Sequence, residues 1–411
     1  LVITVDCGIT AFNELDYAKK INLDIIVVDH HVPEAKLPYA LALVNPNRID
    51  DATNLGMLAA VGVSFMLVGA LKNKLINIGF IKKENSINLS SILDLVALGT
   101  VCDVVPLVGP NRAFVKHGLK VMSKRQNTGI NALFEISNVE DFPNVFHAGF
   151  VLGPRINAGG RVGESDLGAK LLTTDDINYA KKISIHLNIL NEERKKLESD
   201  VLEESKKMAE NYDDNSILVL SGKNWHPGVI GIVASRIVEQ YNKPTIIIAK
   251  NGDNSKGSGR SISGIDIGSI ITTAKQSGIL ENGGGHPMAC GLTINEDKIN
   301  DLRLFINQKN ADQNNKIKKT YLVDMAISVS GAIPELIKQL RLIEPFGAGN
   351  PEPKFILKNV NLFNAKIVGE NHIKCSISDS TNSRLDAIAF RSVGTELGKS
   401  LLNNYHAHVI G

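Results

Sequence analysis

Asp29, His30 and His31 combine a carboxylate with two imidazoles directly after the apolar run of residues 25–28. A short, β-branched run next to a polar turn is typical of a buried strand in a parallel sheet, and such sheets bind ligands just beyond the carboxyl ends of their strands. The three side chains suit a divalent metal ion at that edge. A histidine pair hydrogen-bonded within a loop would have the same sequence, so these residues alone leave both interpretations open.

Two further acids favour the metal ion. Asp6 follows another apolar run, residues 1–5, and a stretch with helical spacing lies between the two runs. Strand, helix and strand in this order predict parallel neighbouring strands, which places Asp6 and Asp29 at equivalent strand ends. Asp103 follows the apolar segment 92–101 and would on its own be a turn or cap residue. Three carboxylates at one rim of a sheet repel each other unless a cation offsets their charge.

This pattern resembles the DHH phosphoesterases. Asp29-His30-His31 is similar to the family signature, while Asp6 in VDCG resembles its second motif and Asp103 in GTVCDVVPL its fourth. Three later stretches resemble the RecJ-type single-strand-specific exonucleases of this family: GPRINAGGR (153–161), GGGHPMACG (283–291) and EPFGAGNPEPKF (344–355). The resemblance runs almost from end to end, and the last stretch is the most specific because other family members lack that third region.

The resemblance implies Mn²⁺ or Mg²⁺, with two ions in the full-length protein, and imidazole ligands favour Mn²⁺. We expect Asp6, His30 and Asp103 to be direct metal ligands. We expect Asp29 and His31 to be catalytic residues that orient the ligands or touch the scissile phosphate. Adjacent side chains of an extended segment point in opposite directions, so the two histidines should have different roles.

Arg155 and Arg161 flank Gly159-Gly160 in a stretch that we expect to be a Gly-Arg loop. Glycines let the main chain approach an anion closely, and arginine binds phosphate through two parallel hydrogen bonds. A turn with solvated charges is the alternative. The resemblance favours phosphate contact and makes both arginines candidate nucleic-acid-binding residues.

Two further glycine-rich stretches contain polar or cationic residues. Residues 257–261 predict a turn, and residues 283–286 place three glycines before a histidine. Three consecutive glycines are costly in a regular element but can line an anion site with main-chain N–H groups, although a flexible linker has the same composition. His286 is also a catalytic candidate, as a donor to a phosphate or to the leaving oxygen. The nucleic-acid-binding residues that the resemblance implies here are Ser258, Arg260, Gly284, Gly285 and His286.

The elements that must position these residues alternate between strands and helices, which predicts an α/β fold. We expect a doubly wound parallel-sheet DHH domain over residues 1–150, with helices over 11–21, 56–74, 90–100 and 111–124. Residues 151–212 should hold the Gly-Arg loop and a long connecting helix over 176–211. A second α/β domain, the DHH-associated substrate-binding domain, is expected over 213–315.

Short strands with frequent turns predict a C-terminal OB-type β-barrel over residues 320–411, with strands over 321–324, 360–368, 372–377, 385–391 and 408–410. The resemblance implies that this domain grips single-stranded nucleic acid. Most aromatic residues of such barrels are core residues. The candidates for stacking and backbone contact are Phe346, Phe355, Phe363, Phe390, Lys354, Lys374 and Arg391.

The composition describes a globular protein whose nucleic-acid-binding surface must be local. The 411 residues carry a net charge of +2 and are 43% hydrophobic. The four cysteines are far apart, with no C-x-x-C spacing, which predicts reduced thiols in the cytoplasm; Cys7 and Cys102 are expected to be buried. The longest apolar stretch, residues 56–71, is shorter than the roughly 20 residues of a membrane span, so we expect no membrane association.

The chain begins with Leu1, inside a predicted strand, and stops at Gly411, inside another. We therefore expect the DHH domain to be truncated at its N-terminus and the barrel to be incomplete. The Asp-x-Asp of the family's first motif is absent from the 411 residues. We hypothesise that this chain has an incomplete metal site, and is inactive or binds metal weakly.

The sequence thus predicts a metal-dependent exonuclease that degrades single-stranded DNA from its 5′ end in DNA repair and recombination; the polarity and the biological role come only from the resemblance. A single-strand-binding protein and a helicase are candidate partners. One alternative is a DHH phosphoesterase for cyclic dinucleotides, nano-RNA or pyrophosphate, which would not need a third domain. The other is a nucleic-acid-binding protein without catalysis, against which the intact Asp29, His30, His31 and Asp103 argue.

Overall fold

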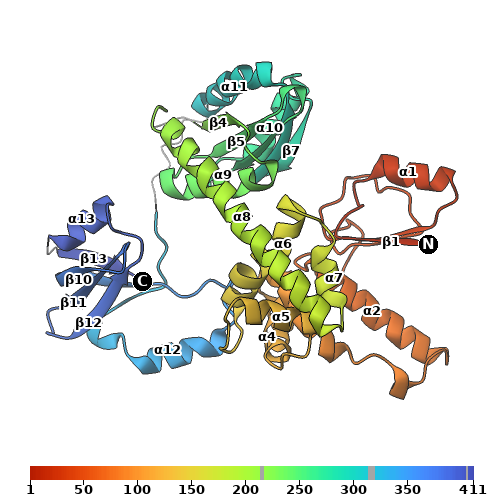
Figure 1. Cartoon of the computed structure of the whole chain (residues 1–411), viewed down its shortest axis with the longest axis horizontal. Helices are drawn as coiled ribbons and strands as arrows, with labels where there is room; N and C mark the ends of the chain where they lie inside the picture. Colours follow the sequence, from red (N-terminus) through yellow and green to blue (C-terminus); the bar gives the residue numbers. More distant parts are fainter. Residues whose placement is uncertain (213–216, 313–319, 404–405) are drawn as a thin grey trace. The chain divides into compact units, whose positions relative to one another are not determined.

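The computed structural model describes residues 1–212, 217–312, 320–403 and 406–411, and its elements are shown in Figure 1. The chain forms two compact units. The first unit consists of Leu1–Lys124, Phe142–Ala148 and Thr320–Gly411, and the second of Arg125–Asp141 and Gly149–Lys319. The domain boundaries expected after residues 150, 212 and 315 stay predictions.

The first unit begins with the expected parallel sheet. Its three strands are β1 (Val2–Val5), β2 (Ile25–Val28) and β3 (Ala42–Val44), in that order, and α1 (Phe12–Lys20) connects the first two. Val5 of β1 is in register with Val28 of β2, so the residues that follow these strands come side by side. The strand–helix–strand prediction is confirmed.

Three helices complete this part of the first unit: α2 (Ala60–Asn77), α3 (Leu93–Cys102) and α4 (Gly109–Met122). They lie within a few residues of the predicted ranges. Helices α3 and α4 can approach closely because Gly118 of α4 has no side chain. A Cβ atom at this position would clash with the carbonyl oxygen of Leu93. This contact lies at the N-terminal start of α3, and Asp103 follows the other end of the helix.

Residues Lys83–Cys102 are long and apolar enough to cross a membrane by length and composition alone. In the structure they are not one continuous helix. Two short 3-10 segments, Lys83–Asn85 and Leu89–Ile92, precede α3, whose 10 residues are too short to cross a hydrocarbon core of about 30 Å at about 1.5 Å per residue. Helix α3 instead buries Val96 and Ala97.

The second unit contains a group of packed helices: α5 (Thr128–Ile136), α6 (Gly153–Val162), α7 (Leu167–Thr173) and α8 (Ile177–Ala209). Helix α8 confirms the long connecting helix. The expectation of a Gly-Arg loop is wrong, because GPRINAGGR forms α6, with Pro154 in its first turn. Gly159 lets α6 pack closely against Leu187 of α8.

The second unit also holds a five-stranded mixed sheet in the order β4-β5-β6-β8-β7. Its strands are β4 (Leu218–Lys223), β5 (Thr245–Lys250), β6 (Ser255–Arg260), β7 (Asn282–His286) and β8 (Ala289–Ile294), and its helices are α9 (Pro227–Tyr241), α10 (Ile267–Gln276) and α11 (Ile299–Asp312). The turn expected at 257–261 is therefore wrong for its main part, which is β6. The three glycines likewise lie in a regular element, the edge strand β7.

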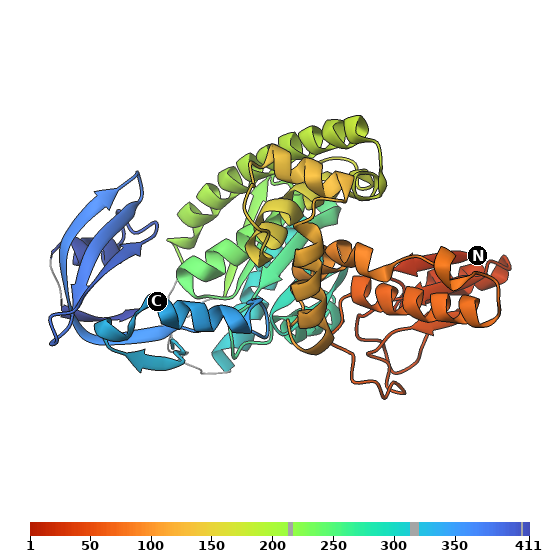
Figure 2. The same ribbon diagram turned by 90° about the horizontal axis from the view of Figure 1, so that it is seen from below.

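Residues 320–411 form a curled half-barrel sheet, whose curl is visible in Figure 2. The order is β12-β11-β10-β13, and β9 also pairs with β10; among the described residues β12 and β13 do not pair with each other. The elements are β9 (Met325–Ile327), α12 (Pro334–Leu340), β10 (Phe355–Val368), β11 (His372–Ser378), β12 (Arg384–Ala389), α13 (Glu396–Leu402) and β13 (His406–Ile410). The strand expected at 321–324 is wrong, since β9 begins at Met325.

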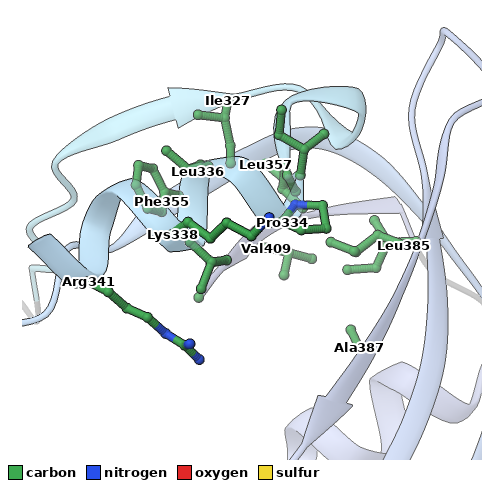
Figure 3. Close-up of a pocket in the computed structure, with 15 residues that line it drawn as sticks. Ile327, Pro334, Leu336, Lys338, Arg341, Phe355, Leu357, Leu385, Ala387 and Val409 are labelled. Atoms are coloured by element: carbon green, nitrogen blue, oxygen red, sulfur yellow. The ribbon is translucent and has the colours of Figure 1, made fainter.

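An apolar groove of about 640 Å³ lies between α12 and the inner face of this sheet. Figure 3 shows Leu336 of α12 and Phe355, Leu357 and Val409 of the sheet lining it. Phe355, one of the stacking candidates, thus faces the groove.

All four cysteines are free thiols, as expected. Cys290 and Cys375 are buried, and burial raises the pKa of Cys102 to about 11. The expectation of a buried Cys7 is wrong, because this residue is exposed at the open rim next to Asp6.

Candidate metal centre and nucleic-acid interface

Asp29 organises the loop after β2 and is itself almost fully buried. Its Oδ1 accepts hydrogen bonds from the main-chain N–H of His30 (2.8 Å) and from Nδ1 of His31 (2.7 Å), and its Oδ2 accepts one from the main-chain N–H of Ile9 (3.1 Å). Burial alone would raise the pKa of Asp29, but these bonds hold it below its usual value. Asp29 is therefore a charged, fully engaged orienting group.

His30 points one ring nitrogen at two carboxylates. Its Nδ1 lies 3.0 Å from the carbonyl oxygen of Leu58, which can only accept a hydrogen bond, so Nδ1 carries the proton. Nε2 lies 3.3 Å from Oδ1 of Asp6 and 3.5 Å from Oδ2 of Asp103, so a metal ion could bind its lone pair in place of a proton. This is the ligand geometry of a metal-binding histidine whose tautomer is fixed by its other nitrogen.

The two acids reach His30 from different elements. Asp6 follows β1 in a left-handed conformation (φ 63°), and its N–H donates to the carbonyl of Val28. Asp103 is the C-cap of α3, so it comes from a helix end and not from a strand end. Burial raises the pKa of Asp103, an effect that His30 opposes and Asp6 reinforces.

The expectation that the two histidine side chains point in opposite directions is wrong, whereas the difference expected between their roles stays a prediction. Their rings are 4.8 Å apart, because the chain is no longer extended after β2. Ligand atoms of Asp6, His30 and His31 all lie within 4.8 Å of one another. Asp29 raises the pKa of His31 through their hydrogen bond, and it also holds the proton of His31 at Nδ1, which leaves Nε2 without a part in that bond.

This donor set fits Mn²⁺ or Mg²⁺. Carboxylate oxygens are ligands for both ions, and an imidazole nitrogen with a fixed tautomer favours Mn²⁺. The structure thus brings the expected ligands Asp6 and Asp103 each to Nε2 of His30, whereas the cluster of ligand atoms within 4.8 Å contains Asp6, His30 and His31. The Asp29 carboxylate instead accepts hydrogen bonds from main-chain N–H groups.

The second unit brings most of the expected nucleic-acid-binding residues onto one sheet. Two rows of cross-strand partners run over β6, β8 and β7: Ser258–Gly291–Gly284 and Arg260–Ala289–His286. Partners in a row, and residues two apart on a strand, share one face of a sheet. A side chain added at Gly284 or Gly291 would meet nothing within 4 Å, so this face is open above both glycines. Gly285 belongs to the opposite face.

Arg161 of α6 joins the same region of the second unit. Its Nη1 donates to the carbonyl of Gly228 in α9 (2.8 Å), and Gly231 of that helix lies against the side chains of Ser258 and Arg260. Burial lowers the pKa of Arg161, and the nearby cations Arg194 and Arg260 lower it further. Glu198 pairs with Arg194 (2.7 Å), and Arg161 and Arg260 are the cations of this region that could bind a phosphate.

Arg155 has a different environment. Its Nε donates to Asn188 of α8 (3.0 Å) and its Nη1 to the carbonyl of Val151 (2.8 Å). The bond to Asn188 stabilises the packing of α6 on α8. Two nitrogens of the Arg155 guanidinium are therefore engaged in contacts within the protein.

Three family models match the chain: the N-terminal domain of the DHH family at residues 1–100, the DHHA1 domain at 214–312 and the RecJ OB domain at 323–410. The single-stranded-DNA-specific exonuclease RecJ of Dickeya dadantii is 36% identical over 409 residues, which cover 95% of this chain and 70% of that protein. The chain belongs to the RecJ family.

Other members of the RecJ family are longer. The RecJ of Bacillus subtilis is 32% identical over 421 residues, which cover 100% of this chain and 51% of that protein. The crystal structure of RecJ from Thermus thermophilus in complex with Mn²⁺ has a TM-score of 0.80 and 31% identity, over 95% of this chain and 56% of that chain. The Mg²⁺ complex of the same RecJ has a TM-score of 0.73 at 29% identity, over 95% and 55%. The chain therefore spans about half the length of these two relatives.

The sequence did not single out the residues that hold the main chain of this RecJ-family metal centre. Asn45 donates to the carbonyl of His31 (2.9 Å), and Asn47 donates to that of His30 (2.6 Å). The available signal was the Asn-Pro-Asn stretch directly after β3. Leu58 gave no signal, because it acts through its carbonyl group.

Proposed function

We propose that this chain carries the catalytic core of a divalent-metal-dependent exonuclease that hydrolyses single-stranded DNA from the 5′ end. The observation that carries the proposal is the convergence of Asp6 and Asp103 on Nε2 of His30, at 3.3 and 3.5 Å. Membership of the RecJ family, whose named relatives are single-stranded-DNA-specific exonucleases, supports the substrate class.

Asp6, His30 and Asp103 would hold Mn²⁺ or Mg²⁺, and we propose two ions in the full-length protein. When bound, such ions activate water and offset the charge that develops on the phosphate. Asp29 keeps the proton of His31 on Nδ1 and stabilises a second proton on its Nε2, since it raises the pKa of this histidine. His31 would then donate a hydrogen bond to a phosphate oxygen.

We assign the open face above Gly284 and Gly291 to the DNA backbone. Ser258, Arg260 and His286 border this face, and Gly285 shapes the edge strand. A phosphate can approach the strand closely where no side chain stands. Arg161 would add a charge-assisted bond, while Arg155 would contact DNA with the donor that its contacts to Asn188 and Val151 leave.

The outer face of the half-barrel suits unstacked bases. The inward residues of β11 alternate with His372 and Lys374, which face outward. Phe390 is 73% exposed, and its ring packs edge-on against His372 at 5.4 Å. Arg384 lies over the ring of Phe363 at 5.6 Å. Aromatic rings with neighbouring cations bind single strands by stacking and by backbone attraction.

We further propose a cytoplasmic role in DNA repair and recombination. A nuclease confined to single strands needs a helicase to expose its substrate, and a single-strand-binding protein covers that substrate in the cell. Both are therefore proposed partners. The four free thiols suit a reducing compartment.

The test is a digestion assay with a long single-stranded oligonucleotide, labelled at either end, in Mn²⁺. We expect the 5′ label to be released at once in small products and the 3′ label to remain on progressively shorter strands. EDTA or His30→Ala should abolish cleavage, whereas His117→Ala, an exposed histidine on α4, should not. A duplex with blunt ends should resist digestion.

The same assay separates the alternatives. Cleavage of a dinucleotide but not of the long strand would favour a small-substrate phosphoesterase. Binding of the long strand without Mn²⁺-dependent cleavage would agree with a nucleic-acid-binding protein or with the inactive, incomplete metal site hypothesised from the absent Asp-x-Asp. Either result would overturn the proposal that this chain hydrolyses single-stranded DNA.

A further inference from the structure

The loop that joins α3 to α4 carries Asp103 in a conformation that its own sequence does not favour. Val104 follows Asp103 and has φ +58°. A β-branched residue in the left-handed region is strained, so contacts from outside the loop must hold it there. The position of the Asp103 carboxylate depends on those contacts.

One side of this loop is held by α4. Asn111 is fully buried, and its Nδ2 donates to the carbonyls of Pro106 (3.0 Å) and Met57 (2.6 Å). The other side faces residues 344–350, which lie far away in the sequence and shortly before β10. We call these residues the 344–350 loop.

The 344–350 loop contacts the Asp103 loop through main chain and through glycines. The N–H of Leu107, which is 2% exposed, donates to the carbonyl of Ala348 (2.6 Å). A side chain at Gly347 would come within 2.7 Å of the Leu107 side chain. Gly349 has φ +68°, and a side chain there would come within 2.7 Å of Pro106. The two glycines are thus required for the close approach.

Polar contacts fix the 344–350 loop itself. Asn350 donates from Nδ2 to the carbonyls of Pro345 (2.8 Å) and Ile343 (3.1 Å). Arg112 of α4 donates from Nη2 to the same carbonyl of Ile343 (2.6 Å). These hydrogen bonds hold the main chain of the 344–350 loop in one conformation.

We propose that the 344–350 loop is a positioning element for the metal centre. It presses on Pro106 and Leu107, and so holds Asp103 where its carboxylate reaches His30. The inference rests on the proposed function, in which Asp103 is a metal ligand. It explains why this stretch contains Gly347, Gly349 and Asn350: these residues support the metal centre about 240 residues upstream in the sequence.

The test compares Gly349→Ala with Gly394→Ala, by calorimetric titration of Mn²⁺ into the full chain. Both glycines have positive φ (+68° and +82°), but an added side chain at Gly394 would meet nothing within 4 Å. Both variants should lose thermal stability without metal, since alanine is strained at either position, and Gly349→Ala should lose more because its side chain also meets Pro106. Only Gly349→Ala should weaken Mn²⁺ binding, by about 10- to 100-fold, the range for partners that orient metal ligands.

If Gly349→Ala does not fold, Arg112→Ala replaces it, with Lys116→Ala on the same helix as the matched loss of charge. Arg112→Ala should weaken Mn²⁺ binding relative to Lys116→Ala. Equal Mn²⁺ affinity in the wild type and in the folded loop variant would overturn this inference alone. If the wild type binds Mn²⁺ no better than His30→Ala, the metal centre and the proposed function fall with it.

Discussion

Asp103 shows how a functional residue is placed at a cost to the metal-free fold. Asp103 is the C-cap residue of α3, so its carboxylate lies at the helix end where the dipole is negative, and it shares His30 with the carboxylate of Asp6. The helix dipole and the Asp6 carboxylate both disfavour a negative charge on Asp103. A bound cation would offset both effects.

Asp103→Asn should therefore stabilise the metal-free protein while destroying its response to metal. Removing a carboxylate from a helix C-terminus is worth about 0.3–1 kcal/mol, which raises the melting temperature of a unit of this size by about 1–4 °C. Mn²⁺ at 100 times its Kd should stabilise the wild type by about 2.7 kcal/mol and the variant by much less. Differential scanning calorimetry with and without Mn²⁺ measures both effects.

The control for this experiment is Asp141→Asn, since Asp141 is an exposed acid of a loop that belongs to the second unit. This change should alter neither quantity. A variant at Asp103 that is less stable without metal, yet still gains the full stabilisation from Mn²⁺, would contradict the account.

At the scale of single residues, the sequence predicted the roles of side chains in the site but did not predict the roles of main-chain groups. Asp6, His30 and Asp103 could be found because acids and histidines after apolar runs are visible in the sequence. The carbonyl of Leu58, which sets the tautomer of His30, belongs to a residue whose type says nothing about that role. The prediction that the two histidine side chains point in opposite directions was wrong, because it assumed an extended backbone beyond the end of β2 at Val28.

Elements with clear periodicity were predictable, and glycine-rich elements were not. The β-branched run of β2 and the helical spacing of α8 reflect burial on a regular face, which hydrophobic patterns record. A glycine in the sequence indicates that a neighbouring group approaches the main chain closely, but it does not indicate whether the residue lies in a helix, a strand or a loop. In α6 the space is taken by α8, and in β6 the side chain of Leu292 packs over Gly257.

The outer face of the half-barrel gives a prediction for a whole element. Phe390→Ala should weaken binding of single-stranded DNA by about 1–3 kcal/mol, because one stacked base loses its platform. Phe80→Ala is the matched control, since this phenylalanine is also exposed (76%) but lies in a loop after α2. Fluorescence anisotropy with a labelled single strand in EDTA measures binding without cleavage.

Mn²⁺ affinity should be the same in Phe390→Ala and in the wild type. Unchanged DNA affinity in Phe390→Ala would show that the outer face does not stack bases. An equal loss in both phenylalanine variants would point to a general effect of exposed aromatic residues.

At the scale of the whole molecule, the chemistry is divided between two compact units. All three expected metal ligands and the 344–350 loop belong to the first unit, whereas Ser258, Arg260 and Arg161 belong to the second. The sequence indicated this division through two separate α/β patterns. It did not indicate that residues 125–141 belong with the second unit, because compactness depends on contacts between distant residues.

This division predicts which unit is stabilised by a bound metal ion. Mn²⁺ at 100 times its Kd should slow hydrogen exchange about 100-fold for amides of the first unit that exchange through its unfolding, including those of the 344–350 loop. Amides of residues 217–312 should exchange at unchanged rates, since the unit that contains them holds none of the three ligands. Exchange measured by mass spectrometry, peptide by peptide, reports both units in one experiment. His30→Ala should show no slowing anywhere, and slowing confined to residues 217–312 would place the ion in the wrong unit and refute the assigned centre.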